Sequence, residues 1–429
     1  MKTMLILTCL TICTTIPVLA QSNAPGGVDL ARASLDTVWQ TVYEYHYDST
    51  FGGLNWKEIH DRYYALAAAA EDDDSFIKLM NQMLLELKLS HYAVFRMEDK
   101  TGSGSPLLSE GSIGIELRLF GNEAVITALD SDFPAAQAGM KPGYQIKSLN
   151  GMSVQQILSG AEAKHIPHFN ERYKISSMCD EVMSYCFGQP GDTVVISYED
   201  GAGNSHGLTL QMKQRTGGTK IAEQFPTVFV DFRAERLSGD IGYIYFSAFI
   251  PSVDSLFLAA VDSMSSIRAL IIDIRGNPGG IHEIGEAIAS KLVSESTLFS
   301  VFRYRDSTQE VSVDPDPPVF EGPIAILIDV MNGSASERFS ACMQSIGRAK
   351  IIGERSPGSV GPSDIKELPN GASFMYLVAQ SLTPDGTVLE GHGVIPDITV
   401  PLDRAALLKG VDTQIERAIV YLESEIKLK

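Results

Sequence analysis

PIAILIDVMNGSASE, residues 323–337, runs from an apolar segment through an Asn-Gly turn into the start of an amphipathic segment. The continuous apolar run is typical of a strand buried on both faces, and the turn puts Ser334 at a helix N-terminus. Free backbone N–H groups at such a position can stabilise an oxyanion, so Ser334 is a candidate nucleophile. Ser-x-x-Glu is also a capping box, and on this local pattern alone capping is the commoner use of the serine.

A second unit of the same kind occurs at residues 269–280, ALIIDIRGNPGG. Gly279 and Gly280 allow backbone amides to approach a ligand closely, as an oxyanion hole requires. Taken alone, this segment is a loop at the start of a helix. Two strand–turn–helix units with their turns at one sheet edge form a cleft, which strengthens the functional interpretation of both.

The rest of the C-terminal half alternates apolar strands with helices, and this predicts a layered α/β core with a sheet buried on both faces. The predicted strands are Gly242–Ile250, Ala269–Ile274, Ile324–Val330, Lys350–Gly353 and Phe374–Ala379, and the predicted helices are His282–Val293 and Ala335–Ile346.

The N-terminal half has a different pattern of apolar and polar residues. Residues 28–100 have helical periodicity, with acidic residues at 72–74 ahead of an apolar face that runs from Phe76 to Leu87. A strand is expected to begin just after Ser90-His91. A Gly/Ser-rich linker at 101–105 precedes β-type alternation up to residue 213, interrupted by a predicted helical insertion at about 155–188.

The length and composition limit the number of domains and the kinds of partner and site that we expect. A chain of 429 residues predicts two or three domains. The formal net charge of −19, from 34 Lys and Arg against 53 Asp and Glu, argues against nucleic acid as a partner. No CxxC or HExxH spacing occurs, so we expect no metal site. Cys179 and Cys186 could pair in an oxidising compartment or remain free thiols, and Cys342 suits a buried apolar position.

The first twenty residues, MKTMLILTCLTICTTIPVLA, resemble a secretory signal peptide with a cleavage site after Ala20. A transmembrane anchor is the alternative, although the apolar run is short and interrupted by threonines. We therefore expect a soluble mature protein without a membrane span, located in a bacterial periplasm or outside the cell.

Four ordered motifs carry a resemblance to a known family: RGNPGG (275–280), NGSASE (332–337), GRAKIIGE (347–354) and LTPDGTVLEGHGVIPDI (382–398). Together they resemble the C-terminal processing (tail-specific) peptidases, and Leu89-Ser90-His91 is more similar to the tricorn-core branch. The resemblance implies a crotonase/ClpP-like layered α/β protease domain (216–429), an inserted PDZ-like β domain (101–215), an N-terminal helical region (21–100) and a signal peptide (1–20).

The resemblance also implies site residues. The family serine falls on Ser334, whereas the Lys that the processing branch uses as a base is replaced by Ser359. The tricorn branch uses a His preceded by Ser together with a distant Glu, which correspond to His91, Ser90 and Glu390. The oxyanion hole would then come from the backbone N–H groups of Ala335 and of Gly279 or Gly280.

Some of these assignments have rivals. His282 and His392 could also enter the cleft, and Glu390 could simply support a turn at 391–393. The other histidines, His46, His60, His165, His168 and His206, are expected at the surface. In the PDZ-like domain, the resemblance gives a peptide-binding loop consisting of Ser112, Ile113, Gly114 and Ile115, followed by PAAQAG (134–139), although the domain could instead only gate or pack against the protease.

The expected function is that of a secreted serine endopeptidase that acts on protein or peptide substrates, in unfolded or C-terminal segments, without a cofactor. A catalytically inert peptide- or lipophile-binding protein on the same scaffold is the main alternative. An acyl-CoA enzyme of the crotonase type is remote, since a signal peptide would separate the chain from CoA. The oligomeric state does not follow from the sequence.

Overall fold

A computed structural model describes residues 27–67, 70, 72–96, 104–164, 169–221, 226–264 and 266–428. The proposed signal peptide, most of the 101–105 linker, His165 and His168 lie outside the described residues. No helix among the described residues is long and apolar enough to cross a membrane.

The main layer is a six-stranded sheet in which all neighbouring strands are parallel except the first pair. In sheet order the strands are β13 (Phe232–Leu237), β14 (Ile241–Phe246), β15 (Ala269–Asp273), β18 (Ile324–Ile328), β19 (Lys350–Gly353) and β23 (Ile398–Thr399). Every residue of β14, β15 and β18 is buried, as the continuous apolar runs predict.

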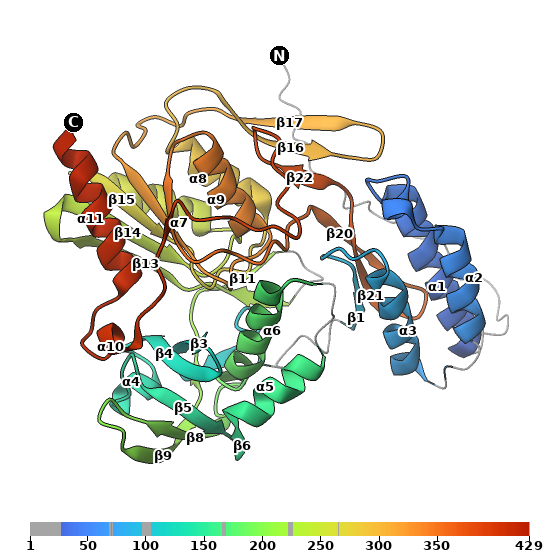
Figure 1. The fold of residues 1–429 in the computed structure, drawn as a ribbon, viewed down its shortest axis with the longest axis horizontal. Coiled ribbons are helices and arrows are strands. Elements are labelled where there is room, and N and C mark those ends of the chain that lie inside the picture. The colour runs from blue at the N-terminus through green and yellow to red at the C-terminus, as the bar shows by residue number, and fades with distance from the viewer. Residues whose placement is uncertain are drawn as a thin grey trace.

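Helices cover both faces of this sheet, as Figure 1 shows. On one face Ile244, Ile272 and Ile326 pack into a cluster with three helices, α7 (Val253–Ser263), α8 (His282–Ser290) and α9 (Ala335–Ser345). On the other face Ile271 and Leu327 pack against Leu422 of α11 (Thr413–Leu428). The predicted layered α/β core is therefore confirmed.

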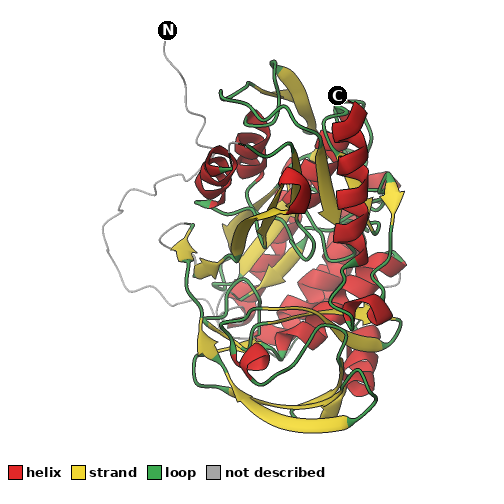
Figure 2. Cartoon of the chain, turned by 90° about the vertical axis from the view of Figure 1, so that its left-hand side faces the viewer, coloured by secondary structure: helices red, strands yellow, loops and turns green. Residues whose placement is uncertain are grey.

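The second unit is a smaller antiparallel sheet with its own core, seen as curved strands at the bottom of Figure 2. Its order is β3 (Ile115–Phe120), β4 (Glu123–Leu129), β5 (Gln145–Leu149), β8 (Thr193–Glu199) and β9 (Ser205–Gln211), with β6 (Met152–Ser153) beside β5. The helices of this unit are α4 (Pro134–Gln137), α5 (Val154–Ala163) and α6 (Glu171–Ser184). The last two are the predicted helical insertion, and β3 is an edge strand.

The N-terminal layer is helical and contains α1 (Gly27–Tyr45), η1 (Phe51–Gly53), α2 (Trp56–Leu66) and α3 (Asp73–Leu85). Asp72 caps α3, because its side chain accepts a hydrogen bond from the Ser75 N–H at 2.8 Å. The layer continues into a three-stranded antiparallel sheet of β1 (Ala93–Phe95), β21 (Ser373–Leu377) and β20 (Ser363–Glu367).

The structure differs from two of the strand predictions. The segment Phe374–Ala379 is a strand but belongs to this small sheet, because its apolar side chains complete the core of the N-terminal helices. The predicted strand Gly242–Ile250 ends at Phe246, because Phe249 leaves the ladder and pairs with Gly280.

Short pieces complete the fold. They are β2 (Gly111–Ser112) between β7 (Phe187–Gly188) and β10 (Lys213–Gln214), the pair β11 (Gly218–Lys220) and β12 (Thr227–Phe229), the sheet of β17 (Thr308–Val313), β16 (Thr297–Arg303) and β22 (Gln380–Leu382), and the helical turns η4 (Ser238–Asp240) and α10 (Arg404–Leu407).

Candidate active site

Ser334 occupies the turn between β18 and α9 with φ +52° and ψ −120°, a region that non-glycine residues rarely adopt. Its side chain is half-buried and makes no capping hydrogen bond to the helix. The capping-box interpretation is therefore wrong. A strained residue with an uncommitted hydroxyl at a helix start is what a nucleophile requires, and such strain gathers at functional sites.

Glu337, the other half of the supposed capping box, has a different role that the sequence did not reveal. Its buried carboxylate accepts hydrogen bonds from the hydroxyl of Ser356, from the N–H of Gly358 at 2.7 Å and from the N–H of Ser359 at 2.8 Å. Burial raises the pKa of Glu337 to about 7, against the lowering effect of these bonds. The carbonyl of Ser359 in turn accepts the N–H of Ser334 at 2.7 Å, so Glu337 holds the loop that holds the backbone of Ser334.

Hydrogen bonds join the turn that follows β15 to the turn that follows β18. The Asn277 carbonyl accepts the hydroxyl of Ser336 at 2.7 Å and the N–H of Gly333 at 3.2 Å, and Asn332 Nδ2 donates to the carbonyl of Ile274 at 2.6 Å. Gly279 lies directly against the nucleophile turn, because a Cβ added there would be 2.7 Å from Ser334 Cβ. This close approach explains the need for glycine at position 279.

The three candidates for the oxyanion hole differ in whether their backbone amides are available. The N–H of Gly279 donates to Asn277 Oδ1 at 2.9 Å, so this amide is already engaged and is not an available donor. Ala335 is the first residue of α9, and its N–H is therefore outside the helical hydrogen-bond ladder. Gly280 and Ala335 both line a cavity of about 290 Å³ together with Ser334, which brings the two remaining candidates beside the hydroxyl.

Ser90, His91 and Glu390, 300 residues apart in the chain, form one hydrogen-bonded chain. Ser90 Oγ lies 2.9 Å from Glu390 Oε2 and 2.7 Å from His91 Nδ1, and the Ser90 N–H donates to Glu390 Oε1 at 2.6 Å. An ionised carboxylate only accepts, so the serine hydroxyl donates to Glu390 and its oxygen accepts the Nδ1–H of His91. This arrangement leaves Nε2 with a free lone pair, the form that a general base needs.

The environment keeps the imidazole neutral. Burial lowers the pKa of His91 to about 4, and burial raises the pKa of Glu390 against the lowering effect of its hydrogen bonds from Ser90 and Val360. The Val360 N–H donates to Glu390 Oε2 at 2.7 Å, and the adjacent Ser359 carbonyl binds the Ser334 N–H. The loop at 359–360 therefore connects both groups, although no hydrogen bond among the described residues joins His91 to Ser334.

The alternative candidates for the general base have other hydrogen-bond or ion-pair partners. His282 lines the cavity with Ser334, but its Nδ1 is bonded to the carboxylate of Glu283. His392 is exposed, with Nδ1 2.9 Å from the carbonyl of Glu390. Lys350 pairs with Asp397 at 3.3 Å rather than approaching Ser334.

One histidine prediction is wrong. His46 is 2% exposed rather than at the surface, because it stacks on Phe51 and its Nδ1 bonds to the Tyr92 hydroxyl at 2.8 Å. Burial lowers the pKa of His46 to about 4. His60 is partly buried, and His206 is exposed as expected.

The proposed peptide-binding loop does not present free amides. The N–H of Ile113 donates to the carbonyl of Cys186 at 3.2 Å, and the N–H of Gly114 donates to Ser112 Oγ at 2.9 Å. Ser112, Ile113 and Ile115 are each at most 3% exposed. Both N–H groups already form hydrogen bonds within their own unit, so they are not available to bind a peptide carboxylate.

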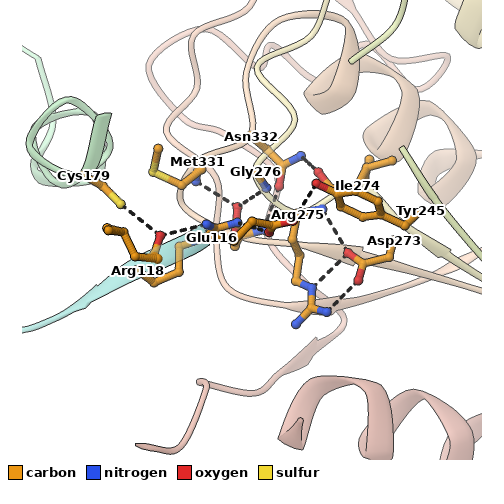
Figure 3. A network of polar contacts seen from close by, with 12 residues as sticks. Glu116, Arg118, Cys179, Tyr245, Asp273, Ile274, Arg275, Gly276, Met331 and Asn332 are labelled. Atoms are coloured by element: carbon orange, nitrogen blue, oxygen red, sulfur yellow. Dashed lines mark hydrogen bonds and ion pairs between the residues drawn. The ribbon is translucent and has the colours of Figure 1, made fainter. Parts of the chain in front are cut away.

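A buried ion pair connects this second unit to the turn that carries Ser334, and Figure 3 labels one partner, Arg118, together with Gly276 and Met331. Arg118 Nε on β3 donates to Asp329 Oδ2 at 2.6 Å, and Asp329 Oδ1 accepts the N–H groups of Gly276 at 3.0 Å and Met331 at 2.9 Å. Asp329 therefore organises both strand-end turns at once. Arg118 also lines a larger cavity of about 640 Å³, whose wall includes Gly333 and Ser359.

Cys179, Cys186 and Cys342 are buried free thiols, so the suggested Cys179–Cys186 pairing is not formed. Among the described residues no three His, Cys, Asp or Glu side chains are grouped as a metal site would require.

A strained serine at a helix start, above a buried parallel sheet, is an arrangement typical of serine hydrolases. Residues 240–400 match the model of peptidase family S41, and residues 31–85 match the model of the tricorn protease C1 domain. The chain therefore carries a peptidase family S41 domain together with a tricorn C1 domain, and these matches make it a serine-type peptidase.

The chain is similar in sequence to a processing protease and in fold to two solved proteases. The carboxy-terminal processing protease CtpA of Bacillus subtilis (strain 168) is 23% identical over 372 residues, which cover 85% of this chain and 72% of that protein. The solved photosystem II D1 C-terminal processing protease has a TM-score of 0.56 at 19% identity, covering 88% of this chain and 96% of that one. The tricorn protease structure has a TM-score of 0.51 at 19% identity, covering 93% of this chain and 37% of that one.

Proposed function

We propose that this protein is a secreted serine endopeptidase that cuts peptide bonds in unfolded or C-terminal segments of proteins, with Ser334 as the nucleophile and His91 as the general base. The observation that carries the proposal is the uncommitted hydroxyl of Ser334 at φ +52°, beside a cavity that Gly280 and Ala335 also line. The names of the relatives, which are carboxy-terminal processing proteases, support the substrate class.

The chemistry follows from the hydrogen-bond chain. His91 Nε2 takes the Ser334 proton while the hydroxyl oxygen attacks the peptide carbonyl, and the imidazolium then protonates the leaving amine to give an acyl-enzyme. Water, deprotonated by the same nitrogen, releases the acid. Glu390 acts through Ser90 to hold the Nδ1–H tautomer and to stabilise the imidazolium. The amides of Gly280 and Ala335 would bind the oxyanion.

The mechanism requires His91 to approach Ser334 when substrate is bound. Catalytic hydrogen bonds are often long in the free enzyme and tighten in the complex. The shared loop at 359–360 supports this requirement, because it bonds to Ser334 on one side and to Glu390 on the other.

The edge strand β3 suggests how substrate is held. We assign residues 101–215 as a PDZ-like unit. PDZ domains bind an extended peptide as an added strand at a sheet edge, and β3 would supply that edge here. The 640 Å³ cavity beside β3, lined by Glu116, Arg118 and Tyr173, supports this placement better than the occupied loop at 112–115. The signal-like residues 1–20 support secretion or a periplasmic location.

Labelling with a fluorophosphonate probe tests the proposal. The wild-type protein should be labelled at Ser334, the Ser334→Ala variant should not be labelled, and the His91→Ala variant should react at least 100-fold more slowly. His282→Ala is the matched control and should react normally. If His282→Ala loses labelling while His91→Ala keeps it, the base is His282.

A catalytically inert binding protein on this scaffold is the second candidate, and the missing His91–Ser334 hydrogen bond favours it. That candidate predicts no labelling of Ser334 in the wild-type protein, together with binding of unfolded peptides that is unaffected by Ser334→Ala.

A further inference from the structure

The strand β20 begins in the wall of the cavity that Ser334 also lines. Ser363, the first residue of β20, belongs to that wall, and the strand continues from there to Glu367 with every one of its residues exposed. The residues just before the strand line the same cavity: Val360, Gly361 and Pro362. A peptide bound beside Ser334 would therefore lie close to the start of this strand.

One edge of β20 has no neighbouring strand. The small sheet has the order β1, β21, β20, so within the described ranges β20 pairs with β21 alone. The unpaired edge of a strand presents backbone N–H and C=O groups that a further extended segment can use.

The hydrogen bonds of the strand show which residues turn their backbone groups to the free edge. The carbonyl of Pro362 accepts the N–H of Val378 at 3.0 Å, and so it points toward β21. The C=O and N–H of one peptide unit point in opposite directions, so the N–H of Ser363 points to the free edge. No bulge interrupts the pairing of β20 with β21, and backbone groups alternate along a strand, so Ile365 and Glu367 face the same edge as Ser363.

Most of these outward groups have no partner. The N–H of Ile365 donates to Asp364 Oδ1 at 2.8 Å. The N–H groups of Ser363 and Glu367, and the carbonyls of all three outward residues, take part in no hydrogen bond within the part of the chain that the structure describes. A partner strand would therefore find two donors and three acceptors on this edge.

We propose that β20 binds the substrate segment that precedes the scissile bond, and that this segment adds to the sheet as an antiparallel strand. The inference rests on the proposed function and identifies how the same site holds its substrate. Both strand pairs of the small sheet are antiparallel, and antiparallel pairing is slightly more stable per residue than parallel pairing. In this orientation the C-terminal end of the bound segment lies beside Ser363, near Ser334, and the preceding residues extend toward Glu367.

The proposal defines the substrate class by its backbone. Main-chain hydrogen bonds require an extended, unfolded segment before the scissile bond but no particular side chain. Substrate residues opposite Ser363, Ile365 and Glu367 would donate their N–H groups to the carbonyls of β20, whereas the residues between them would point their N–H groups away.

N-methylated peptides test this alternation with the full chain. Sites in denatured casein are mapped by mass spectrometry, and the best-cleaved peptide is resynthesised with a single N-methyl group at each residue before the scissile bond in turn. An N-methyl group removes one hydrogen-bond donor. We expect kcat/KM to fall about three- to tenfold at every second position and to stay within about twofold at the positions between.

Glu367→Pro tests whether β20 supplies the partner groups. Because the Glu367 N–H points outward, proline removes a donor from the free edge without taking a hydrogen bond from the pairing with β21. The readout is the ratio of kcat/KM for the full peptide to kcat/KM for a peptide with only two residues before the scissile bond. Glu367→Pro should reduce this ratio at least threefold.

Thr209→Pro is the matched control, since Thr209 is exposed on β9, which is also an edge strand. Its N–H points outward too, because the carbonyl of the opposite residue, Val195, accepts the N–H of Asn150 on the other side. This variant should keep the ratio of the wild type.

The outcomes separate the two levels of the proposal. If Ser334 is not labelled by the probe and no casein is cleaved, the proposed function fails, and this inference fails with it. If peptides are cleaved but the effects of N-methylation do not alternate before the scissile bond, only this inference fails. Alternation with an unchanged ratio in Glu367→Pro, or an equal loss in Thr209→Pro, would overturn the assignment to β20.

Discussion

Replacing Arg118 by Met is expected to loosen the turn that carries Ser334, although Arg118 lies on a different sheet. Arg118 and Asp329 have side chains only 10% and 2% exposed, and their ion pair is 2.6 Å long. After the substitution, Asp329 would keep the N–H groups of Gly276 and Met331 but would lose its counter-ion. Removing one partner of a buried pair costs about 3–5 kcal/mol, because the remaining charge stays buried.

Hydrogen exchange measured by mass spectrometry reports this cost locally. Peptides that cover 274–280 and 329–335 should lose roughly two to four orders of magnitude of protection in Arg118→Met, up to the limit set by global unfolding. The double variant with Asp329→Asn should recover part of the loss, because no unpaired charge remains. Lys57→Met is the control, since Lys57 and Asp61 form a pair that is 76% and 62% exposed and worth at most about 1 kcal/mol. Protection of both peptides within tenfold of the wild type would refute the reasoning.

Three further predictions concern the site itself. Gly279→Ala should reduce probe labelling at least 100-fold, because its Cβ would lie 2.7 Å from Ser334 Cβ, whereas Gly160→Ala, with open space around it, should label normally. The pH profile of kcat/KM should fall between pH 5 and pH 4, where His91 gains a proton and can no longer act as a base; activity that is unchanged across this interval would contradict this. Glu337→Gln should lower the free energy of unfolding by about 1–3 kcal/mol in thermal melts, because its amide nitrogen cannot accept one of the loop N–H groups; an unchanged melting temperature would be inconsistent with that role.

The main sheet was predictable because its strands are apolar on both faces. The predicted strand at 350–353 and the starts of the helices at His282 and Ala335 agree with the structure, since each lies near a sharp change between a continuous apolar run and helical spacing. The sheet partner of the segment at 373–377 was not predictable. The sequence of an apolar strand does not specify which hydrophobic core it joins. Here the core is formed by helices more than 280 residues earlier in the chain.

The candidate site was only partly accessible from the sequence. The resemblance brought Ser90, His91 and Glu390 together, but the capping-box pattern of Ser334 and Glu337 suggested local hydrogen bonds that do not form. Local pattern could not reveal that Glu337 bonds to a loop some twenty residues further on, because those contacts depend on the path of the loop in three dimensions. The same limit applies to Gly279, whose amide is taken by a neighbouring side chain.

The 300-residue separation between Ser90 and Glu390 has a consequence for biosynthesis. A ribosome releases Ser90 and His91 early, Ser334 much later and Glu390 near the end, so a nascent chain cannot assemble the full hydrogen-bonded relay. Premature termination before residue 390 would yield a product that contains Ser334 and His91 but lacks the carboxylate that accepts the hydrogen bond of the Ser90 hydroxyl. The hydrogen-bonded chain of Ser90, His91 and Glu390 can therefore form only after almost all of the polypeptide has been made.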